Sequence, residues 1–328
     1  MDDVRFDGAG NGRDSRGRVA VVALGGNALI ADAEHQSVQD QFERMRVTAM
    51  PLVDMVQDGW RIVVTHGNGP QVGVCLLSNE LARNMVDEVP MDVCVADTQG
   101  SLGYMIQQQL QNEFMRRNIP RTVATVINQV VVDPEDEAYR HPTKPVGTWY
   151  DRTRAQSMAA ERGWTVSEDA GRGWRRVVAS PRPLEIVEVD AIRALVERGL
   201  IVVGAGGGGI PVVRDEAGLL RGSPAVIDKD HASSLLAEGI GADLLLISTG
   251  VEQVALNFRQ QNQINLERLT VEEAQRYLLD GHFASGSMAP KIEASINFVR
   301  HTGKQALITS PEAIGRALRC ETGTWIVP

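Results

Sequence analysis

Cysteine is scarce in this sequence, and its scarcity limits the kinds of site that the chain can build. The 328 residues include three cysteines, Cys75, Cys94 and Cys320, with no CxxC pair. An odd number at wide spacing argues against a disulfide framework, and no His/Cys spacing supplies the four ligands of a zinc site. We therefore expect small, buried or partly buried thiols and a reducing compartment.

Long apolar runs and clusters of basic residues are also missing. No run approaches the roughly 20 residues of a membrane span, and the N-terminal segment has no apolar stretch of the kind found in secretory signals. The net charge is −9, and no Lys/Arg cluster is large enough to form the basic face that binds a nucleic acid duplex. These absences predict a cytoplasmic protein that binds neither membrane nor nucleic acid. Residues 1–17, rich in Gly, Asp and Arg, predict a disordered tail.

Glycine is abundant, and many of the 32 glycines gather in short loops that follow apolar runs. The Val-rich run 18–24 predicts a strand that is buried on both faces, as in a parallel sheet. The order of strand, Gly-rich loop and helix then recurs, which predicts βαβ units with right-handed crossovers. Further strands are expected at 61–65, 122–132, 201–203, 210–214, 244–249, 306–309 and 324–327, and helices at 38–58, from about 72, 92–116, 231–238, 290–302 and 311–319.

These elements predict an α/β fold in which helices cover both faces of a mainly parallel sheet. The stretch 134–182 breaks the rhythm, because it is polar with scattered Pro, Gly, Arg and Trp. Within it, 164–167 and 174–179 predict a hairpin around 169–173. We expect 134–182 to form an inserted subdomain, or lid, that covers the active site.

Three Gly-rich loops fall at the carboxyl ends of predicted strands, where open α/β sheets bind their ligands. They are Gly25-Gly26-Asn27, Gly67-Asn68-Gly69 and the run 204–209. Glycine lets the backbone approach a ligand closely, and free N–H groups at helix N-termini attract anions. Three such loops favour a phosphate site over three simple turns, although none matches the P-loop pattern. The run GAGGGG leaves a dinucleotide site as an alternative. The segment 210–214 argues against it, because it looks extended where such a site would have a helix.

Three lysines lie in unusual surroundings, flanked by turn-forming or apolar residues: Lys144, Lys229 and Lys291. Phosphoryl transfer needs positive groups at the moving phosphate and little covalent chemistry from the protein. Asp228 and Asp230 bracket Lys229, which suits either a lysine held in place or a metal–phosphate site. Local sequence alone does not distinguish these two interpretations from surface ion pairs, which contribute little to stability. His66, between a strand and a Gly-rich loop, either faces the site or has a structural role.

Eight segments stand out in order along the chain: 21–29 (VVALGGNAL), 64–73 (VTHGNGPQVG), 98–105, 142–147 (PTKPVG), 171–178, 204–211, 226–230 (VIDKD) and 286–293. Together they resemble the carbamate kinases of the amino acid kinase superfamily. The resemblance runs from about residue 18 to 328 and implies a three-layer αβα sandwich forming a single domain. Its N-terminal half, 18–200, would bind carbamate or carbamoyl phosphate and include the lid at about 134–182, and its C-terminal half, 201–328, would bind the nucleotide.

The activity that the resemblance implies is reversible phosphoryl transfer between carbamoyl phosphate and ADP. It would give ATP and carbamate, which breaks down to ammonia and CO₂. The resemblance also implies a homodimer and Mg²⁺ that is carried mainly by the nucleotide phosphates, with no metal-binding residue specified. Arginine metabolism is one host pathway, with purine and allantoin breakdown as others. The alternatives are another acyl-phosphate or amino acid kinase of the same fold, and a ligand-binding homologue that would have lost its catalytic charges.

Site residues follow from the matching positions. Related kinases of this fold often carry a lysine just before the first Gly-Gly, and Lys144 on the lid would replace it here. Ala289, Gln260-Gln261 and Thr148-Trp149 depart from the family pattern, at the nucleotide side and on the lid, without removing a charged candidate. The resemblance implies catalytic roles for Lys144, Lys229, Asp230 and Lys291, substrate binding by Gly25, Gly26, Asn27, Gly67, Asn68 and Gly69, and nucleotide binding by Gly206, Gly207, Ser248, Thr249, Gly250, Val251, Met288 and Lys291.

Overall fold

The computed structural model describes residues 17–30, 35, 37–168 and 173–328. The predicted tail therefore lies outside the described residues except for Gly17, and so does the turn 169–172 of the expected hairpin. Within the described ranges, no helix has both the length and the hydrophobicity that crossing a bilayer requires.

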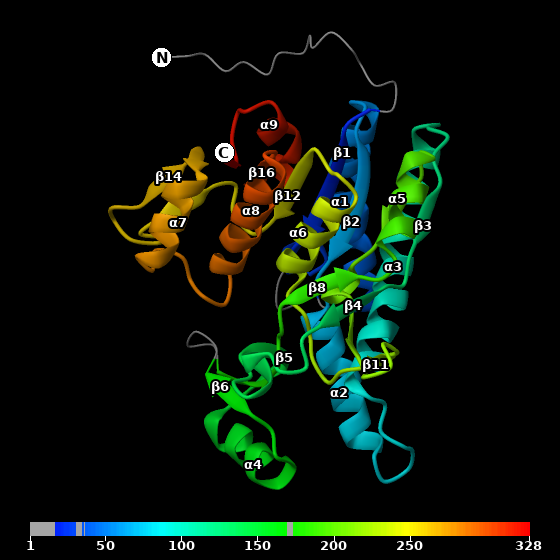
Figure 1. Cartoon of the computed structure of the whole chain (residues 1–328), viewed down its shortest axis with the longest axis vertical. Helices are drawn as coiled ribbons and strands as arrows, with labels where there is room; N and C mark the ends of the chain where they lie inside the picture. The colour runs from blue at the N-terminus through cyan, green and yellow to red at the C-terminus, as the bar shows by residue number, and fades with distance from the viewer. Residues whose placement is uncertain (1–16, 31–34, 36, 169–172) are drawn as a thin grey trace.

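An eight-stranded sheet forms the centre of the molecule, in the order β15-β17-β16-β12-β1-β2-β9-β3 (Figure 1). Its strands pair in parallel except where β17 meets β16, which confirms the mainly parallel sheet. The strands are β1 (Val19–Leu24), β2 (Arg61–His66), β3 (Val123–Thr125), β9 (Ile201–Val203), β12 (Leu244–Ser248), β15 (Arg268–Thr270), β16 (Gln305–Thr309) and β17 (Thr324–Val327).

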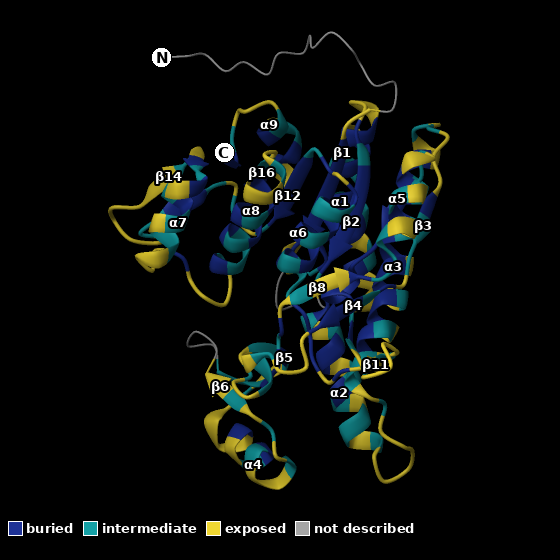
Figure 2. Cartoon of the chain, in the orientation of Figure 1, coloured by how far each residue is buried: buried dark blue, intermediate teal, exposed yellow. Residues whose placement is uncertain are grey.

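Helices cover both faces of this sheet. Alternate residues of β1 enter two separate apolar clusters, Val19, Val21 and Ala23 on one face and Ala20, Val22 and Leu24 on the other. Such alternation is the period of a strand whose two faces are both buried, and Figure 2 shows these strands in dark blue between the helices. One layer contains α5 (Val189–Glu197), α6 (Lys229–Gly239), α7 (Val271–Leu279) and α8 (Ala289–Thr302), and the other α1 (Val38–Gln57), α3 (Met91–Arg116) and α9 (Ile314–Leu318). The three-layer αβα sandwich is confirmed.

Smaller sheets flank the central one. The segment 134–182 contains an antiparallel sheet, β5-β7-β6, and helix α4, which Figure 1 shows beyond the end of the central sheet. The pairing of β6 with β7 confirms the predicted hairpin. The remaining elements are β5 (Lys144–Tyr150), β6 (Val166–Glu168), β7 (Trp174–Val178), α4 (Arg152–Arg162), α2 (Gly69–Ala82), the sheet of β11 (Leu220–Gly222), β10 (Ile210–Arg214), β4 (Gln129–Val132) and β8 (Pro183–Ile186), the pair β13 (Val254–Leu256) and β14 (Ile264–Leu266), and the short 3₁₀ turns η1 (Gly26–Ala28), η2 (Glu137–Tyr139), η3 (Gly206–Gly208) and η4 (Pro311–Ala313).

The prediction of one strand over 122–132 is wrong. The run divides into β3, in the central sheet, and β4, in the sheet with β8, β10 and β11. Between them, the buried side chain of Asn128 accepts a hydrogen bond from the backbone N–H of Ala205 at 2.7 Å, and Gln99 bonds both the N–H and the carbonyl of Asn128. These bonds satisfy the backbone where the chain leaves one sheet for the other.

Two predicted helices have different bounds in the structure. The helix expected from about residue 72 begins at Gly69, with Pro70 in its first turn, where proline lacks only an N–H that would have no helical partner. The helix expected over 311–319 is the turn η4 followed by the short helix α9. The other predicted helices and strands are confirmed to within about two residues at each end.

Candidate active site

The Gly-rich loops meet at the carboxyl edge of the central sheet. Gly25 follows β1 and Gly67 follows β2, and the ends of these strands are paired in register. The third loop packs directly beneath the second. A Cβ on Gly206 would lie 2.4 Å from Nε2 of His66, and a Cβ on Gly207, whose φ is +64°, would lie 2.1 Å from Nδ2 of Asn68. Only glycine allows this approach.

A cavity of about 210 Å³ lies where the loops converge. It brings the Gly-rich loops to the three lysines that the sequence singles out, although these come from segments far apart in the chain. The lysines outnumber the aspartates in its wall, so the cavity is positively charged, as a phosphate site must be. Among its lining residues are Gly26, Gly67, Asn68, Gly69, Lys144, Gly207, Asp228, Lys229, Asp230, Ser287 and Lys291.

The lysines are held by two aspartates at the start of α6. Asp230 accepts from Lys229 at 2.5 Å through Oδ1 and from Lys291 at 2.9 Å through Oδ2. Asp228 accepts from Lys144 at 2.5 Å through Oδ2, while its Oδ1 caps the helix by accepting from the N–H of Asp230 at 2.9 Å. Charge-assisted bonds of this kind fix long side chains in direction as well as position.

Burial and neighbouring charge oppose each other in this network. Burial alone would raise the pKa of Asp230, but Lys229 and Lys291 outweigh it and hold that pKa below its usual range. Burial lowers the pKa of Lys229 in spite of Asp230, whereas the attraction of Asp230 overcomes burial at Lys291 and raises its pKa. Lys144 likewise outweighs burial at Asp228 and lowers the pKa of that carboxyl. The aspartates are therefore ionised near neutral pH.

The loop after β1 is anchored from α1. Arg44 donates from Nε to the carbonyl of Asn27 at 2.8 Å and pairs with Glu312 at 2.6 Å. Thr48 donates to the carbonyl of Ala28 at 3.0 Å. These supports were not found from the sequence, because Arg44 is one polar residue of an amphipathic helix and its partners are not its neighbours in the chain.

His66 has a structural position. Its ring is buried, Nδ1 lies 3.1 Å from the carbonyl oxygen of Gly67, and Nε2 faces Gly206. Burial lowers the pKa of His66 to about 4, with Lys229 acting in the same direction. The ring is therefore neutral at pH 7 and packs the Gly-rich loops together, which decides between the two roles considered for it.

A larger cavity of about 830 Å³ opens beside the first, and the two share Ser287. Of the residues predicted to bind nucleotide, Thr249, Gly250, Val251 and Met288 line the larger cavity, together with Asn27. Its wall also contains residues that the sequence did not indicate, most of them around the loop between β13 and β14 and before α8: Phe258, Arg259, His282 and Phe283.

The other predicted residues lie elsewhere. Gly207 and Lys291 line the smaller cavity. Gly25, Gly206 and Ser248 are buried and are not among the lining residues of either cavity. A Cβ on Gly25 would lie 2.6 Å from the carbonyl oxygen of Ser248, so these two residues join β1 to β12 behind the site.

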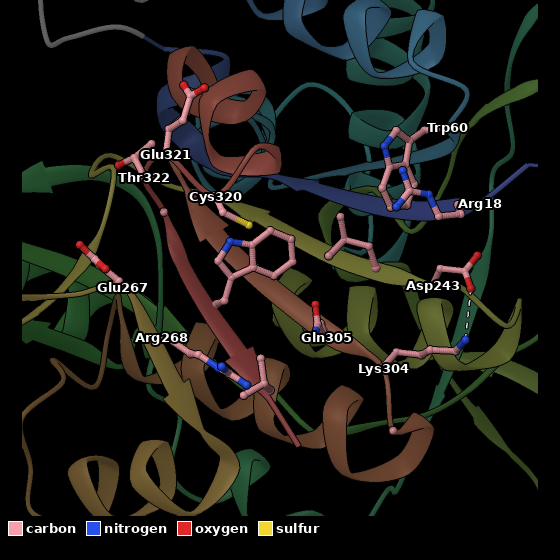
Figure 3. A pocket seen from close by; sticks show the side chains of 15 residues that line it. Arg18, Trp60, Asp243, Glu267, Arg268, Lys304, Gln305, Cys320, Glu321 and Thr322 are labelled. Atoms are coloured by element: carbon pink, nitrogen blue, oxygen red, sulfur yellow. Dashed lines mark hydrogen bonds and ion pairs between the residues drawn. The ribbon is translucent and has the colours of Figure 1, made fainter. Parts of the chain in front are cut away.

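A further pocket of about 610 Å³ lies away from this chemistry, against the beginnings of β1, β12 and β16 and along β17 (Figure 3). Arg18 stacks on Trp60 at 4.1 Å from the ring centroid, and Lys304 pairs with Asp243 at 3.3 Å. None of the predicted site residues lines it. Charged groups of both signs surround it, so it lacks the positive character of the smaller cavity.

The two aspartates of the smaller cavity are already bonded within the protein, so a metal ion there would be held mainly by a bound substrate. All four carboxylate oxygens of Asp228 and Asp230 already accept hydrogen bonds. Within the described ranges, no group of three or more His, Cys, Asp or Glu side chains could hold an ion. Mg²⁺ usually keeps several waters and is held by substrate phosphates with one or two carboxylates, which fits this arrangement better than a protein cage.

Comparison with known proteins gives a consistent result. The sequence model of the amino acid kinase family matches residues 18–310. The carbamate kinase-like protein YahI of Escherichia coli (strain K12) is 48% identical over 94% of this chain and 98% of its own length. The carbamate kinase of Pyrococcus horikoshii is 46% identical over the same shares. The structure of carbamate kinase from Giardia lamblia bound to AMP-PNP has a TM-score of 0.87 and 42% identity, covering 95% of this chain and 98% of that one.

Proposed function

The chain belongs to the amino acid kinase family, and on that basis we propose that it acts as a carbamate kinase. It is an enzyme that transfers the phosphoryl group of carbamoyl phosphate to ADP and, in the reverse direction, that of ATP to carbamate. The bond between phosphorus and the carbamate oxygen breaks, and a bond between phosphorus and the terminal oxygen of ADP forms. ATP and carbamate are the products. One observation carries this proposal: three lysines from distant segments line a cavity that three Gly-rich loops surround.

The transferred group would bind in the smaller cavity. Lys144, Lys229 and Lys291 would stabilise the negative charge of its oxygens, and backbone N–H groups of the Gly-rich loops would bind it from the opposite side. The reaction requires no covalent intermediate on the protein, and the neutral, buried His66 is not placed to supply one. Rate enhancement would come from positioning and from electrostatic stabilisation in a partly closed site.

Asp228 and Asp230 would act on the lysines rather than on the substrate. Asp230 holds Lys229 and Lys291 apart at its two oxygens, and Asp228 holds Lys144 against the start of α6. Each lysine thereby enters the reaction already oriented. Preorganised charge costs little reorganisation as the phosphoryl group moves, which is why such networks accelerate transfer.

The nucleotide would occupy the larger cavity. Thr249, Gly250, Val251 and Met288 line it, and the AMP-PNP complex of the Giardia lamblia relative supports a nucleotide in this fold. Since the cavities share Ser287, the terminal phosphate of ADP would point toward the lysines. Mg²⁺, held by the nucleotide phosphates, would neutralise part of their charge when bound. The departures from the family pattern, Ala289 and Gln260-Gln261, would affect nucleotide affinity at this side.

The assembly, compartment and pathway are finer parts of the proposal. We infer a homodimer, a cytoplasmic location and a role in arginine metabolism, with purine or allantoin breakdown as the other sources of carbamoyl phosphate. Strand β3 is an edge of the central sheet, and large apolar side chains are exposed on α3, which packs against it, and just after β3, which supports a dimer. They are Tyr104, Met115 and Ile127.

The experiment that tests the reaction is formation of ATP from ADP, Mg²⁺ and carbamoyl phosphate. We expect Lys144→Ala and Lys291→Ala to lower kcat by about 100-fold or more, because each removes a charge from the transition state. Lys304→Ala, which removes a lysine outside both cavities, is the matched control and should retain wild-type activity. Chelation of Mg²⁺ should abolish ATP formation and its return restore it.

Wild-type rates in both cavity variants would contradict the proposed site. Absence of ATP from folded wild-type protein would contradict the proposed substrate. In that case acetyl phosphate and phosphorylation of amino acids by ATP are the next substrates to test, since they distinguish another acyl-phosphate kinase from a ligand-binding homologue that turns over none of them.

A further inference from the structure

Arg182 joins the base of the segment 134–182 to both helices that carry the catalytic lysines of the C-terminal half. Its Nη2 donates to Oε2 of Glu293 on α8 at 2.7 Å, and its Nη1 lies 2.6 Å from Nε2 of His231 on α6. His231 Nε2 lies 3.4 Å from the same oxygen of Glu293. The three side chains thus form one cluster across two helices and the inserted segment.

The main chain of Arg182 is held as well. Its N–H donates at 3.0 Å to Oδ2 of Asp136, near the other end of the inserted segment, and Oδ1 of Asp136 accepts from the N–H of Ala138. Asp136 therefore binds the two ends of the segment together. The Arg182 side chain extends from this base to the C-terminal half.

The neighbours of these helix residues are the groups proposed to act on the phosphoryl group. His231 directly follows Asp230, and Glu293 lies two residues beyond Lys291. Other contacts tie the inserted segment to the chain just before α6. The hydroxyl of Tyr139 bonds that of Ser223, and the N–H of Val226 donates to the carbonyl of Ala179 at 3.0 Å.

We propose that Arg182 is a positioning residue for phosphoryl transfer, which locks the base of the inserted segment to α6 and α8. The lysine on the inserted segment and the two lysines of the C-terminal half then reach the phosphoryl group in one fixed arrangement. This inference rests on the proposed function. It adds a residue that touches neither substrate and acts through the placement of those that do.

The cluster contributes to the local placement of these segments more than to the global free energy of folding. The Arg182 side chain is 57% exposed, and exposed ion pairs add little to the free energy of folding. His231, by contrast, is 11% exposed and Glu293 31% exposed, so Arg182 bonds to groups whose own positions packing determines. A displacement of about 1 Å in a catalytic group can cost about 100-fold in rate.

The test compares Arg182→Met with Arg182→Lys and Glu293→Gln. Methionine keeps the aliphatic length and the backbone bond to Asp136, while it removes the guanidinium. Arg214→Met is the matched control, because Arg214 also pairs with a glutamate at 2.8 Å, Glu185, away from both cavities. Steady-state kcat and KM for ADP and carbamoyl phosphate would be measured for each, with thermal unfolding to show that each is folded.

We expect Arg182→Met and Glu293→Gln each to lower kcat about tenfold or more, with KM changed less than about threefold. Arg182→Lys should recover part of the loss, since it keeps a charge but not the two-pronged contact. A variant that combines Arg182→Met with Glu293→Gln should lose no more kcat than the worse of the two single variants, because both changes remove the same contact. Arg214→Met should stay within about twofold of wild type.

Hydrogen exchange separates this inference from the proposed substrate, because it requires no turnover. Arg182→Met should speed exchange in β5, which carries Lys144, and in the first turn of α6, whatever phosphoryl donor the enzyme uses. A kcat within about twofold of wild type, additive losses in the double variant, or unchanged exchange in both segments would each overturn the positioning role.

Discussion

At the scale of single residues, the adjacent glycines 25 and 26 serve different purposes. A Cβ on Gly25 would lie 2.6 Å from the carbonyl oxygen of Ser248, whereas a Cβ on Gly26 would have no atom within 4 Å. Gly25 is buried between two strands, and Gly26 lines the smaller cavity. The first glycine is therefore required by packing, and the second by the space that a ligand needs.

Alanine at each position should separate these requirements. Gly25→Ala should destabilise the protein by about 1–3 kcal/mol, since the backbone of β12 must shift to admit the methyl group. Gly26→Ala should unfold at the wild-type urea concentration but raise KM for carbamoyl phosphate, because the methyl group occupies the cavity. Urea unfolding and steady-state kinetics on both variants give the comparison. Equal stability of the two variants would contradict it.

His66 should make stability depend on pH. Its folded pKa of about 4 lies below the ordinary value of 6.5, because the ring is buried. The unfolded chain therefore binds a proton that the folded chain does not, and stability should fall as pH drops from about 6.5 toward 4, by up to about 3 kcal/mol. The free energy of unfolding, measured with urea across this range, should fall more steeply with decreasing pH in wild type than in His66→Gln.

His141 supplies the control for that titration. Its side chain is 78% exposed, so His141→Gln should leave the pH dependence of unfolding unchanged. The same slope in wild type and His66→Gln would show that other groups cause the loss of stability in acid.

At the scale of elements, the run 122–132 contains two strands of different sheets that a local apolar pattern does not distinguish from one strand. Two short apolar strands in line give the same sequence pattern as one longer strand, since both are runs of apolar, β-branched residues. Asn128 lies between the two strands, and its partners Gln99 and Ala205 lie 29 and 77 residues away in the chain. No local sequence pattern shows such a partner, whereas the Gly-rich loops after β1 and β2 are visible in the local sequence.

Removing the Asn128 side chain should test its role in this division. Asn128→Ala leaves the buried N–H of Ala205 without its acceptor, which should cost about 1–3 kcal/mol of stability. Asn262→Ala, on an exposed loop, is the control and should change stability by less than about 0.5 kcal/mol. Urea unfolding measures both. An unchanged midpoint in Asn128→Ala would mean that the break between β3 and β4 does not depend on this bond.

At the scale of the whole molecule, the exposed apolar residues of α3, the helix that packs against the edge strand β3, bear on assembly. We expect light scattering to give about twice the chain mass of 35.7 kDa. Replacing both Tyr104 and Met115, which are 56% and 66% exposed, by glutamate should yield monomers, because charge there would be buried in the interface. Leu279→Glu, at a residue 77% exposed on α7, should leave the dimer intact. A wild-type monomer would contradict the proposed homodimer.

The sequence by itself determined the fold class and the chemistry available to the site. Buried strands, Gly-rich loops and helix signals depend on residues close together in the chain, so periodicity and loop composition were enough to predict them. The ordered motifs of the family resemblance, from 21–29 to 286–293, also indicated which lysines to follow.

Only the tertiary structure decided how those residues meet. Lys144 and Asp228 are 84 residues apart, and Lys291 and Asp230 are 61 apart, yet each pair forms one ion pair. Arg44, which bonds the loop after β1, and Arg182, which bonds α6 and α8, lie outside all of those motifs. Ion pairs depend on the distance between charges in space, which the folding of the sheet and its helices sets and which spacing along the chain does not record.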